Sequence, residues 1–587
     1  MNHVTGVSLA SLAIGLAITG WNAATGRTGD LRDLRAGHEI PDEGYCDQPY
    51  VVLTKEGRWL CTLTTGPGEE GRKGQHVVAT ISADRGRTWS KLIDFEPSDG
   101  PEASWIVPLA TPGGRIYGFY TYNGDRVGTL RGKPIRADML GWYVFKYSDD
   151  NGRTWSERHR LPMPIAACDR GNDWQGAVQI FWGIDKPNVA GGDVVFAFTR
   201  LGRYMLERGE GWVCRSNNVL AETDPAKLHW EFLPEADHGI RAEKFGSVQE
   251  EHNLVPLSGK SLFCAYRTTL GHPCQTYSRD GGRTWTEPEP MTYTPGGRTI
   301  KTGRACPMLW RTANGKYLFW FHNQGGQSFE NRNPVWIIGG EERDGALHWS
   351  QPEILLYHPK RTVRISYPDL IEQEGDYWVT ETEKTVARVH AIDKSLLVGL
   401  WNQGHAKGVS RDGLLLDLAG EQVRANPVKI PKTLNFARSS GLSLDLWVEV
   451  DTLASGQLIL DSRTPDGRGL ALLTSDHNSL RLEMSDGASK VSWDAEPEVL
   501  VARKLHHVVA IADSGPRVIT LVVDGVLCDG GSHQPQGWGR FSTALADVSG
   551  SGVLRIAPAL AGRVERLRLY DRYLRTSEAV AHFHAGP

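Results

Sequence analysis

The eight residues SADRGRTW, at positions 82–89, occur again as SDDNGRTW at 148–155 and as SRDGGRTW at 278–285. Ser, Asp, Gly, Thr and Trp keep the same offsets in each copy. The Asp can accept backbone N–H groups, the Gly can supply a positive φ, and the Trp can pack on a neighbouring sheet, which predicts a turn between two strands. Altered copies, DPAKLHW and RDGALHW, end at Trp230 and Trp349. The copies lie roughly 55 to 75 residues apart, a spacing typical of a radial repeat.

A second repeat supports this interpretation. Six times a polar or aromatic residue leads an extended segment, a Gly-containing turn follows, and a second segment returns, which is the pattern of a β-hairpin. The six are DQPYVVLTKEGRWLCTL (47–63), EASWIVPLATPGGRIYGFY (102–120), DKPNVAGGDVVFAF (185–198), EEHNLVPLSGKSLFCAYR (250–267), RACPMLWRTANGKYLFWFH (304–322) and SYPDLIEQEGDYWVTETE (366–383). Six hairpins with interleaved Trp turns predict an all-β fold, a six-bladed β-propeller over residues 35–400.

The rest of the chain has a different pattern. Short strands with tight turns, such as LSLDLWVEVDTL (442–453) and VITLVVDGVL (518–527), predict a β-sandwich of the jelly-roll type over residues 436–587. This part resembles laminin-G and concanavalin-like domains, for which we expect either glycan binding or packing against the propeller. Residues 401–435 contain the polar, proline-containing stretch GEQVRANPVKIPKT (420–433) and are predicted to form a linker.

Composition and the N-terminus limit the partners. The 587 residues carry a net charge of −4, which argues against nucleic acid as a partner, because phosphate binding needs an excess of Lys and Arg. An apolar run at 7–18 followed by the small residues NAATG (22–26) predicts a signal peptide over residues 1–25 and a secreted, periplasmic or cell-surface protein. An uncleaved N-terminal anchor is the alternative, and no other segment is expected to cross a membrane. No cofactor is predicted, although a structural calcium ion in the second domain is left open.

The eight cysteines include no CxxC pair, which argues against a zinc or redox motif. For an exported chain the even number allows disulfides, and Cys264 with Cys274 is the first pair to consider. Buried free thiols are the equal alternative.

The hairpins also predict a ligand site. Inner strands of a propeller crowd its axis, so the residues at their heads line one end of the central channel. Laying the hairpins over one another collects Asp47, Gln48, Glu102, Asp185, Lys186, Glu250, Glu251, Arg304 and Tyr367, and the ends of the returning strands add Arg200, Arg267, His322 and Glu381. Such a ring of charged groups is too polar for an unpaired core and favours a binding site for a polar, ionised ligand.

The SxDxGxTW turns resemble the Asp-boxes of the sialidase (neuraminidase) superfamily, and the resemblance spans the propeller. In that family a Glu at the head of one blade precedes a substrate-binding Arg and then an Asp-box. Glu251, Arg267 and the box at 278–285 follow this order, and Arg304 resembles the next binding Arg.

The family's Tyr-Ser-x-Leu motif is similar to YPDL (367–370), with Glu381 and Glu383 after it. The resemblance implies that Tyr367 is the nucleophile, that Glu251 withdraws its proton, and that Glu381 or Glu383 orients an arginine. A tyrosine with its ordinary pKa near 10 needs such a carboxylate. A neutral nucleophile also suits an anomeric carbon that bears a carboxylate, and sialidases with a Tyr nucleophile are a known exception to the two-carboxylate scheme.

Two positions depart from the family pattern. YCDQP (45–49) places Asp47 where the family has the first Arg of its carboxylate-binding triad, and an acid there would repel a sialate carboxylate. Where the family has its general-acid Asp, the nearest polar residues are Gln75 and His76, and His76 is expected to donate or accept a proton. Asp47 could instead bind sugar hydroxyls or act opposite Glu251.

Three functions follow. The leading one is an exo-acting glycoside hydrolase on a glycan, expected to be acidic, with Tyr367, Glu251, His76 and Asp47 as catalytic residues. The residues expected to bind substrate are Arg267, Arg304, Glu381, Glu102, Gln48, His322 and Lys186. The alternatives are a uronate lyase that uses His76, a nearby tyrosine such as Tyr120 or Tyr122, and one Arg, and a non-catalytic carbohydrate-binding protein.

Overall fold

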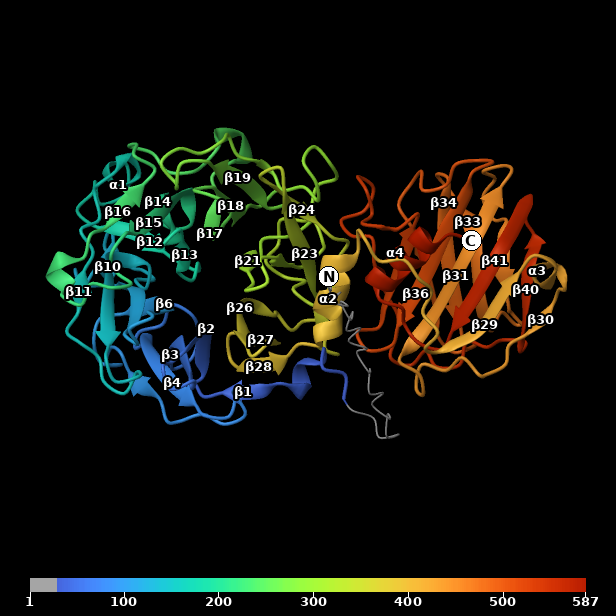
Figure 1. Cartoon of the computed structure of the whole chain (residues 1–587), viewed down its shortest axis with the longest axis horizontal. Helices are drawn as coiled ribbons and strands as arrows, with labels where there is room; N and C mark the ends of the chain where they lie inside the picture. Colours follow the sequence, from blue (N-terminus) through green and yellow to red (C-terminus); the bar gives the residue numbers. More distant parts are fainter. Residues whose placement is uncertain (1–28) are drawn as a thin grey trace, which may run out of the picture.

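The computed structural model describes residues 29–587, which form a β-propeller and a β-sandwich lying side by side (Figure 1). The predicted signal peptide, residues 1–25, lies outside the described residues. Both the all-β class and the order of propeller and sandwich predicted from the sequence are confirmed.

Six antiparallel blades are formed by five sheets among the described residues, since the second and third blades share one nine-stranded sheet, and the strands of each blade are named from the axis outward. The first three are β2 (Tyr45–Leu53), β3 (Trp59–Gly66), β4 (His76–Ser82) and β5 (Ile93–Asp94); β6 (Ala103–Ala110), β7 (Ile116–Tyr122), β10 (Leu140–Ser148) and β11 (His159–Arg160); and β13 (Asn188–Ala190), β14 (Asp193–Arg203), β15 (Glu207–Ser216) and β16 (Glu231–Leu233). The strand β12 (Gln179–Trp182) pairs with both β10 and β14 and so joins the second blade to the third.

The other three blades are β17 (Glu250–Pro256), β18 (Leu262–Arg267), β19 (Cys274–Ser278) and β20 (Glu289–Pro290); β21 (Met308–Arg311), β22 (Tyr317–Phe321), β23 (Val335–Arg343) and β24 (Ala346–Trp349), with β25 (Glu353–Leu356) on β23; and β26 (Ser366–Gln373), β27 (Asp376–Thr382), β28 (Ala387–Ala391) and β1 (His38–Ile40). The N-terminal strand β1 pairs with β28, with His38 opposite Val389. The ring is therefore closed by backbone hydrogen bonds between the two ends of the propeller sequence.

The Asp-box turns have the conformation that their sequence predicts. In the first, Asp84 accepts hydrogen bonds from the backbone N–H of Thr88 at 2.9 Å and from its hydroxyl at 2.6 Å, and Gly86 N–H donates to the Ser82 hydroxyl at 2.8 Å. Gly86 has φ +79° and would place a Cβ within 3.0 Å of the Trp59 ring. The hydrogen bonds from Thr88 lower the pKa of Asp84 to about 2, so the turn keeps its acceptor over the whole physiological range.

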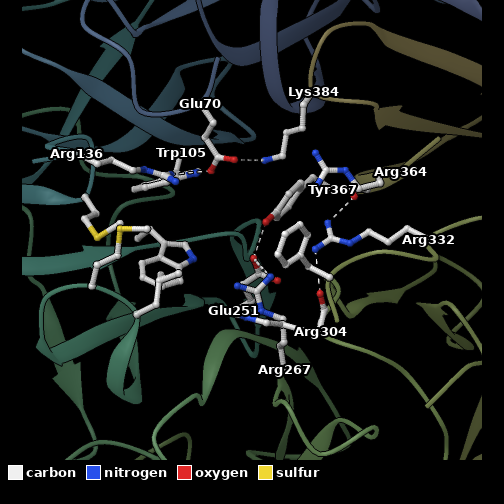
Figure 2. Close-up of a pocket in the computed structure, with 16 residues that line it drawn as sticks. Glu70, Trp105, Arg136, Glu251, Arg267, Arg304, Arg332, Arg364, Tyr367 and Lys384 are labelled. Carbon is white, nitrogen blue, oxygen red and sulfur yellow. Dashed lines mark hydrogen bonds and ion pairs between the residues drawn. The ribbon is translucent and has the colours of Figure 1, made fainter. Parts of the chain in front are cut away.

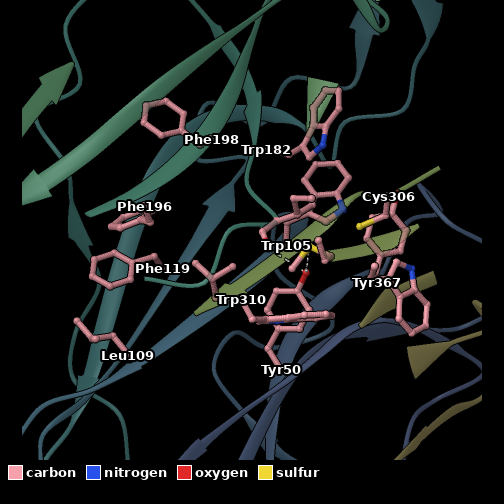
Figure 3. Packing of buried hydrophobic residues seen from close by; sticks show 14 of the residues in the cluster. Tyr50, Trp105, Leu109, Phe119, Trp182, Phe196, Phe198, Cys306, Trp310 and Tyr367 are labelled. Carbon is pink, nitrogen blue, oxygen red and sulfur yellow. Dashed lines mark hydrogen bonds between the residues drawn. The ribbon is translucent and has the colours of Figure 1, made fainter. Parts of the chain in front are cut away.

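Polar side chains link neighbouring inner strands. In each case an Asp or Asn on one inner strand, or just before it, accepts a hydrogen bond from a backbone N–H of the next blade: Asp185 from Leu254 at 3.3 Å, Asn253 from Leu309 at 2.9 Å and Asp369 from Val51 at 2.7 Å. Inner strands diverge around the axis and cannot pair with each other, so these side chains satisfy backbone groups that would otherwise be buried without partners. Aromatic side chains such as Tyr50 and Trp105 fill the space between the strands (Figure 3).

The sandwich consists of two sheets packed on an apolar core. In strand order they are β29 (Leu414–Ala419), β41 (Gly562–Tyr570), β31 (Gly441–Val450), β36 (Leu505–Asp513), β37 (Val518–Val523) and β38 (Val526–Leu527), with β39 (Gly539–Arg540) on β37; and β30 (Val428–Lys429), β40 (Val553–Ala559), β32 (Leu458–Asp461), β33 (Gly469–Ser475), β34 (Ser479–Ser485) and β35 (Lys490–Asp494). Because β29 and β30 belong to these sheets, much of the segment predicted as a linker, residues 401–435, is part of the sandwich.

The sandwich packs firmly on the fifth blade. Trp336 and Ile338 of β23 share one apolar cluster with Ile511 and Val522 of the sandwich. The buried Glu353 carboxylate accepts hydrogen bonds from the first backbone N–H groups of α4 (Thr576–Ala585), at 3.2 and 2.8 Å. A carboxylate at a helix N-terminus compensates both the free N–H groups and the helix dipole.

All eight cysteines lie in the described residues and are buried free thiols. Cys264 and Cys274, the first pair considered for a disulfide, are therefore not bonded to each other. On β18 and β19, Cys264 lies opposite Thr276 and Cys274 lies opposite Tyr266. No helix within residues 29–587 is long and apolar enough to cross a bilayer.

We predict that Asp445→Asn destabilises the sandwich. The buried Asp445 carboxylate, on β31, interacts with His507 at 3.2 Å, with Arg568 at 3.3 Å and with His582 of α4. An amide would place an N–H₂ donor against these donors and remove one of the two carboxylates that Arg568 contacts, the other being Asp417 at 3.4 Å, which costs about 3–5 kcal/mol. We expect the thermal transition to fall by roughly 10 °C.

The control is the exposed Asp476→Asn, which should leave the transition unchanged. Burial opposes ionisation of Asp445, but hydrogen bonds from the two histidines lower its pKa. Its stabilisation is therefore complete above the unfolded value of about 3.9 and is lost as pH falls below it, so wild type and variant should converge in acid. Equal transitions at pH 7 would contradict the assigned role.

Candidate functional site

A pocket of about 330 Å³ opens where the six blades meet (Figure 2). Every blade contributes to its wall: Glu70 from the first; Trp105, Arg136 and Met139 from the second; Trp182, Met205 and Leu206 from the third; Glu251 and Arg267 from the fourth; Arg304, Phe329 and Arg332 from the fifth; and Arg364, Ser366, Tyr367 and Lys384 from the sixth. The volume is at the small end of ligand pockets and fits one sugar-sized ligand.

A shared backbone device orients residues at the heads of four inner strands. The register slips by a bulge in β2, β6, β17 and β26, and within each slip one non-glycine residue has φ between +47° and +55°. These residues are Gln48, Trp105, Glu251 and Tyr367. A bulge with positive φ turns one side chain out of the strand's alternation, and such strain clusters at functional sites. Three of the four line the pocket, whereas Gln48 is buried and donates to Gly183 O at 3.1 Å.

Tyr367 and Glu251 meet at the centre of the pocket. The Tyr367 hydroxyl donates to Glu251 Oε1 at 2.7 Å, and Arg267 Nη1 lies 2.8 Å from the same oxygen. Burial and the neighbouring Glu251 carboxylate raise the pKa of Tyr367 well above its ordinary value. The phenol is therefore neutral at rest, and its hydrogen bond marks the route by which its proton can leave.

The second carboxylate oxygen of Glu251 accepts no hydrogen bond from the described chain. Its Oε2 atom is buried and has no hydrogen-bond partner within residues 29–587. The neighbouring Glu250 points the other way and binds Arg267 Nη2 at 2.5 Å and Arg304 Nη2 at 3.2 Å. The two adjacent carboxylates thus have different tasks, because Glu250 holds two guanidinium groups in place while Glu251 faces the ligand space.

Arg332 is a pocket residue that the hairpin pattern did not indicate. It lies in the segment between β22 and β23, is buried, and donates to the Ser366 hydroxyl at 2.7 Å and to Arg304 O at 2.9 Å. Within the described chain no carboxylate lies within 4.0 Å of it, and burial lowers its pKa. A buried guanidinium without a counter-ion is well suited to bind an anionic ligand.

Asp47 does not act as a repelling charge in the pocket, contrary to expectation. It is fully buried and accepts hydrogen bonds from the Tyr45 hydroxyl at 3.0 Å and from Lys384 Nζ at 2.6 Å. Lys384 lines the pocket with its ammonium 4.2 Å from the centre of the Tyr367 ring. The acid at this position therefore anchors a cation that faces the ligand space.

The same chain of charges continues to a further carboxylate that the sequence motifs did not indicate. Glu70 lies 3.4 Å from Lys384 and 2.7 Å from Arg136 (Figure 2). The Nε of Arg136 is in turn 2.7 Å from Asp138. Burial would raise the pKa of Glu70, but Lys384 and Arg136 lower it to about 2. Glu70 precedes the first Asp-box, in the region where the family resemblance places a proton donor.

The wall opposite Arg332 and Arg364 is apolar. Trp105 and Trp182 lie with their ring centres 5.8 Å apart, and Met139, Met205 and Leu206 complete this side. Aromatic faces pack well against the C–H faces of sugars and their apolar substituents. The pocket thus has one charged and one apolar side.

His76 does not reach the pocket. It lies on β4, the third strand of its blade, where Nδ1 is 3.1 Å from Gly74 O and Nε2 is 3.7 Å from Asp94. Glu381 is likewise buried behind the inner strand, at 3.5 Å from Arg388 and 3.4 Å from His390, so the arginine nearest to it is not a pocket residue. Neither residue lies on an inner strand, and the contacts of both side chains are with groups outside the pocket wall.

Four other predicted ligands have structural partners outside the pocket wall. Glu102 accepts from Asn123 at 3.0 Å, and Gln48 is turned inward as described. His322 lies 3.0 Å from Ile365 O, and burial lowers its pKa to about 3. Lys186 donates to Val51 O at 2.6 Å and to Asp369 at 2.7 Å, which strengthens the link between inner strands. Of the predicted residues, the pocket therefore brings together Tyr367, Glu251, Arg267 and Arg304, with Asp47 directly behind.

No group of three or more His, Cys, Asp or Glu side chains within residues 29–587 is arranged to hold a metal ion. A search of the curated proteins finds no match to this chain. Two family models do match: a BNR repeat-like domain over residues 102–379 and the concanavalin A-like lectin/glucanases superfamily over residues 423–580.

Solved structures similar to this chain include sialidases. The Trypanosoma rangeli sialidase in complex with 2,3-difluorosialic acid is 15% identical, with 94% of this chain and 96% of that chain covered and a TM-score of 0.44. A Hadza microbial sialidase is 18% identical, with 60% and 66% covered and a TM-score of 0.42. A protein of unknown function from Dyadobacter fermentans is 13% identical, with 61% and 97% covered and a TM-score of 0.46. The chain thus combines a BNR repeat-like propeller with a concanavalin A-like, laminin-G domain.

Proposed function

We propose that the protein is an exo-acting glycoside hydrolase that removes a terminal, negatively charged sugar from a glycan. The observation that carries this proposal is the 2.7 Å hydrogen bond from Tyr367 to Glu251 at the centre of a cation-lined pocket. A tyrosine hydrogen-bonded to a carboxylate matches the arrangement of a nucleophile and its general base.

The charge of the pocket supports an anionic substrate. Its wall holds six cationic side chains (Arg136, Arg267, Arg304, Arg332, Arg364 and Lys384) and two carboxylates (Glu70 and Glu251). Three further carboxylates lie directly behind the wall, namely Asp47, Asp138 and Glu250, so cations still exceed carboxylates by six to five. Arg332 and Arg364 have no carboxylate within 4.0 Å in the described chain, and a ligand carboxylate or sulfate would supply a counter-ion.

The reaction needs one proton transfer on each side of the anomeric carbon. The Tyr367 oxygen forms a bond to that carbon, its proton passes to Glu251, and the glycosidic C–O bond breaks with its electron pair on the leaving oxygen. Water then forms a bond to the anomeric carbon as the bond to Tyr367 breaks; Glu251 returns the proton to the phenol oxygen, and the surplus proton of the water passes to the carboxylate that protonated the leaving oxygen. A neutral tyrosine can approach an anionic sugar without repulsion, whereas a carboxylate nucleophile would be repelled by the negative charge of the sugar.

Glu70 is the proposed proton donor to the leaving oxygen, in place of His76. In the free protein it is ionised, because Lys384 and Arg136 hold its pKa at about 2. An anionic sugar that draws these cations to itself weakens their hold on Glu70, and its pKa then rises towards that of a useful acid. Substrate binding would thereby prepare the acid.

The lyase alternative loses its catalytic histidine. His76 contacts Gly74 and Asp94 outside the pocket, and the Tyr120 hydroxyl is bound to Glu96. A non-catalytic carbohydrate-binding protein remains as an outcome of the experiments that follow.

The first test compares aryl glycosides of anionic sugars, an α-sialoside and a β-glucuronide, with a neutral β-galactoside. We expect release of the aryl group from an anionic glycoside only. Glu251→Gln and Tyr367→Phe should each lower kcat/KM by about 10²- to 10⁴-fold, because each removes one half of the proton-transfer pair.

The matched control is Tyr143→Phe, since Tyr143 is equally buried but its hydroxyl has no partner in the described chain. It should keep the wild-type rate. Tight binding without turnover would favour the carbohydrate-binding alternative, and an ultraviolet-absorbing unsaturated product would favour the lyase. A Tyr367→Phe variant with the wild-type rate would refute the proposed nucleophile.

A second prediction separates the binding role of Lys384 from its role in stability. Lys384→Met leaves the buried Asp47 without its cation and should destabilise the protein by about 3 kcal/mol or more. The double variant Lys384→Met/Asp47→Asn removes both charges and should recover most of that stability. Affinity for the anionic sugar should nevertheless stay about tenfold or more below wild type in the double variant, since the cation is still missing. Full recovery of affinity would show that Lys384 is only structural.

A third prediction concerns protons. When an anionic sugar binds to the Tyr367→Phe protein, Glu70 should take up a proton as its pKa rises from about 2. Calorimetry near pH 4.5 in two buffers of different ionisation enthalpy should register uptake on the order of half a proton. Glu70→Gln should abolish the uptake, and its exposed neighbour Glu69→Gln should not. Uptake that survives Glu70→Gln would assign the proton to another group.

A further inference from the structure

From the pocket, positive charge without ion-pair partners in the described chain continues towards the sandwich. The segments 328–334, 358–364, 515–518 and 538–545 contain six Lys and Arg residues (Arg332, Lys360, Arg361, Arg364, Arg517 and Arg540) and one acidic residue, Glu330. Within the described chain no ion pair within 4.0 Å involves any of these seven. The first two segments belong to the propeller and the last two to the sandwich.

Hydrogen bonds and ring contacts join these segments into one surface. Asn333, next to Arg332 of the pocket, donates to Lys360 O at 3.0 Å and accepts from Arg540 of the sandwich through its carbonyl. Arg361 donates to Phe541 O at 3.5 Å, and Arg517 lies over the Phe541 ring at 5.5 Å from its centre. We call Lys360, Arg361, Arg517 and Arg540 the basic track. It begins shortly before the pocket residue Arg364 and crosses onto the sandwich.

The track keeps unused hydrogen-bonding capacity. Its arginines donate only to backbone carbonyls: Arg361 to Phe541, Arg517 to Leu545 at 3.4 Å and Arg540 to Pro516 at 3.3 Å as well as Asn333. A guanidinium has five N–H donors, so several remain for a ligand. Lys360 and Arg361 are exposed, and Arg517 and Arg540 are half-buried. Burial, and then the like charge of Arg361, lower the pKa of Arg540 to about 10.

Clustered cations of like charge are unfavourable in the free protein and become favourable when an anion neutralises them. Phe329 continues this surface to the mouth of the pocket, where it is exposed and carries Arg364 over its ring at 5.4 Å. An aromatic face beside a guanidinium can hold both the apolar face and the charge of a sugar.

We propose that the basic track binds the continuation of a polyanionic glycan, one with carboxylate or sulfate groups on successive sugars, whose terminal sugar occupies the pocket. This inference rests on the proposed function for the identity of the ligand class. It assigns to the sandwich a direct role in substrate binding through Arg517 and Arg540, in addition to its packing on the fifth blade.

The test measures binding by the full-length Tyr367→Phe protein, so that turnover does not interfere. The probes are a galacturonate hexasaccharide, which carries carboxylates only, a heparin-derived hexasaccharide, which is sulfated, and neutral maltohexaose. Lys360→Gln/Arg361→Gln should weaken binding of at least one charged hexasaccharide by about tenfold, and the loss should shrink at high salt. Glucuronate alone should bind as before, because neither residue lies in the pocket.

The matched control is Arg424→Gln/Lys429→Gln, which removes two exposed, unpaired charges from the far end of the sandwich, near α3 (Glu421–Arg424) and β30 (Figure 1). It should leave all affinities unchanged. Equal losses in both double variants would indicate non-specific attraction and overturn the proposal, as would no loss in the track variant or equal binding of the neutral hexasaccharide. If the hexasaccharide binds through the track but the wild-type enzyme cleaves no anionic glycoside, the track stands and the hydrolase function falls.

Discussion

The propeller depends on buried hydrogen bonds that backbone N–H groups of one blade donate to Asp and Asn side chains of its neighbour. Six inner strands arranged around an axis present backbone N–H groups that no neighbouring strand can pair with, and a buried unpaired N–H is costly. On β17 and β26 the linking residue lies two positions after the bulged residue: Asn253 follows Glu251, and Asp369 follows Tyr367. Each of these three-residue stretches therefore links two blades and also orients a pocket side chain, Glu251 or Tyr367. The hydrogen bond between the blades thus helps to fix the position of that side chain.

Opposite charges alternate along the pocket wall, and this alternation sets the protonation of its groups. From Asp47 the chain of contacts runs through Lys384, Glu70 and Arg136 to Asp138, so each interior charge has two neighbours of opposite sign. Such a chain holds Glu70 ionised although it is largely removed from water. On the other side, Glu250 and Glu251 hold Arg267 and Arg304, while Arg332 is bound only by neutral oxygens. The unbalanced positive charge is thus confined to the side where Tyr367 meets a ligand.

The sequence predicts the architecture well because the repeated elements are local. An Asp-box or a Gly-containing hairpin carries its own turn chemistry, so its conformation can be inferred without knowing its neighbours. The same repeats locate Tyr367, Glu251, Arg267 and Arg304, since these residues begin or end the inner hairpins. Arg332, Glu70 and Lys384 lie on connections outside those hairpins, where length and sequence differ from blade to blade, and overlaying the hairpins could not find them.

Overlaying the six hairpins also could not decide which of two adjacent residues a β-bulge would turn towards the axis. Asp47 with Gln48 and Glu250 with Glu251 are equivalent pairs in the sequence, but in each pair only the second residue has a positive φ. Backbone geometry of this kind depends on how neighbouring inner strands pack, which a single sequence does not contain.

Asp47 shows how an acidic residue at a position expected to be basic can still leave the site with a positive charge. The family resemblance places an arginine at the position of Asp47, and it matches the acid after the YPDL motif to Glu381 or Glu383. In this chain the cation is Lys384, directly after Glu383, and it lies 2.6 Å from Asp47, so a lysine from one segment stands in exchange for an arginine in the other. A lysine is a point charge on a flexible stem, whereas an arginine presents a rigid fork, so the exchange trades bidentate geometry for mobility. Because Lys384 also contacts Glu70, any ligand that draws it away changes the field at the proposed acid. In the proposed mechanism, this contact couples recognition of the substrate charge to proton transfer, which an arginine fixed by a single acid would not do.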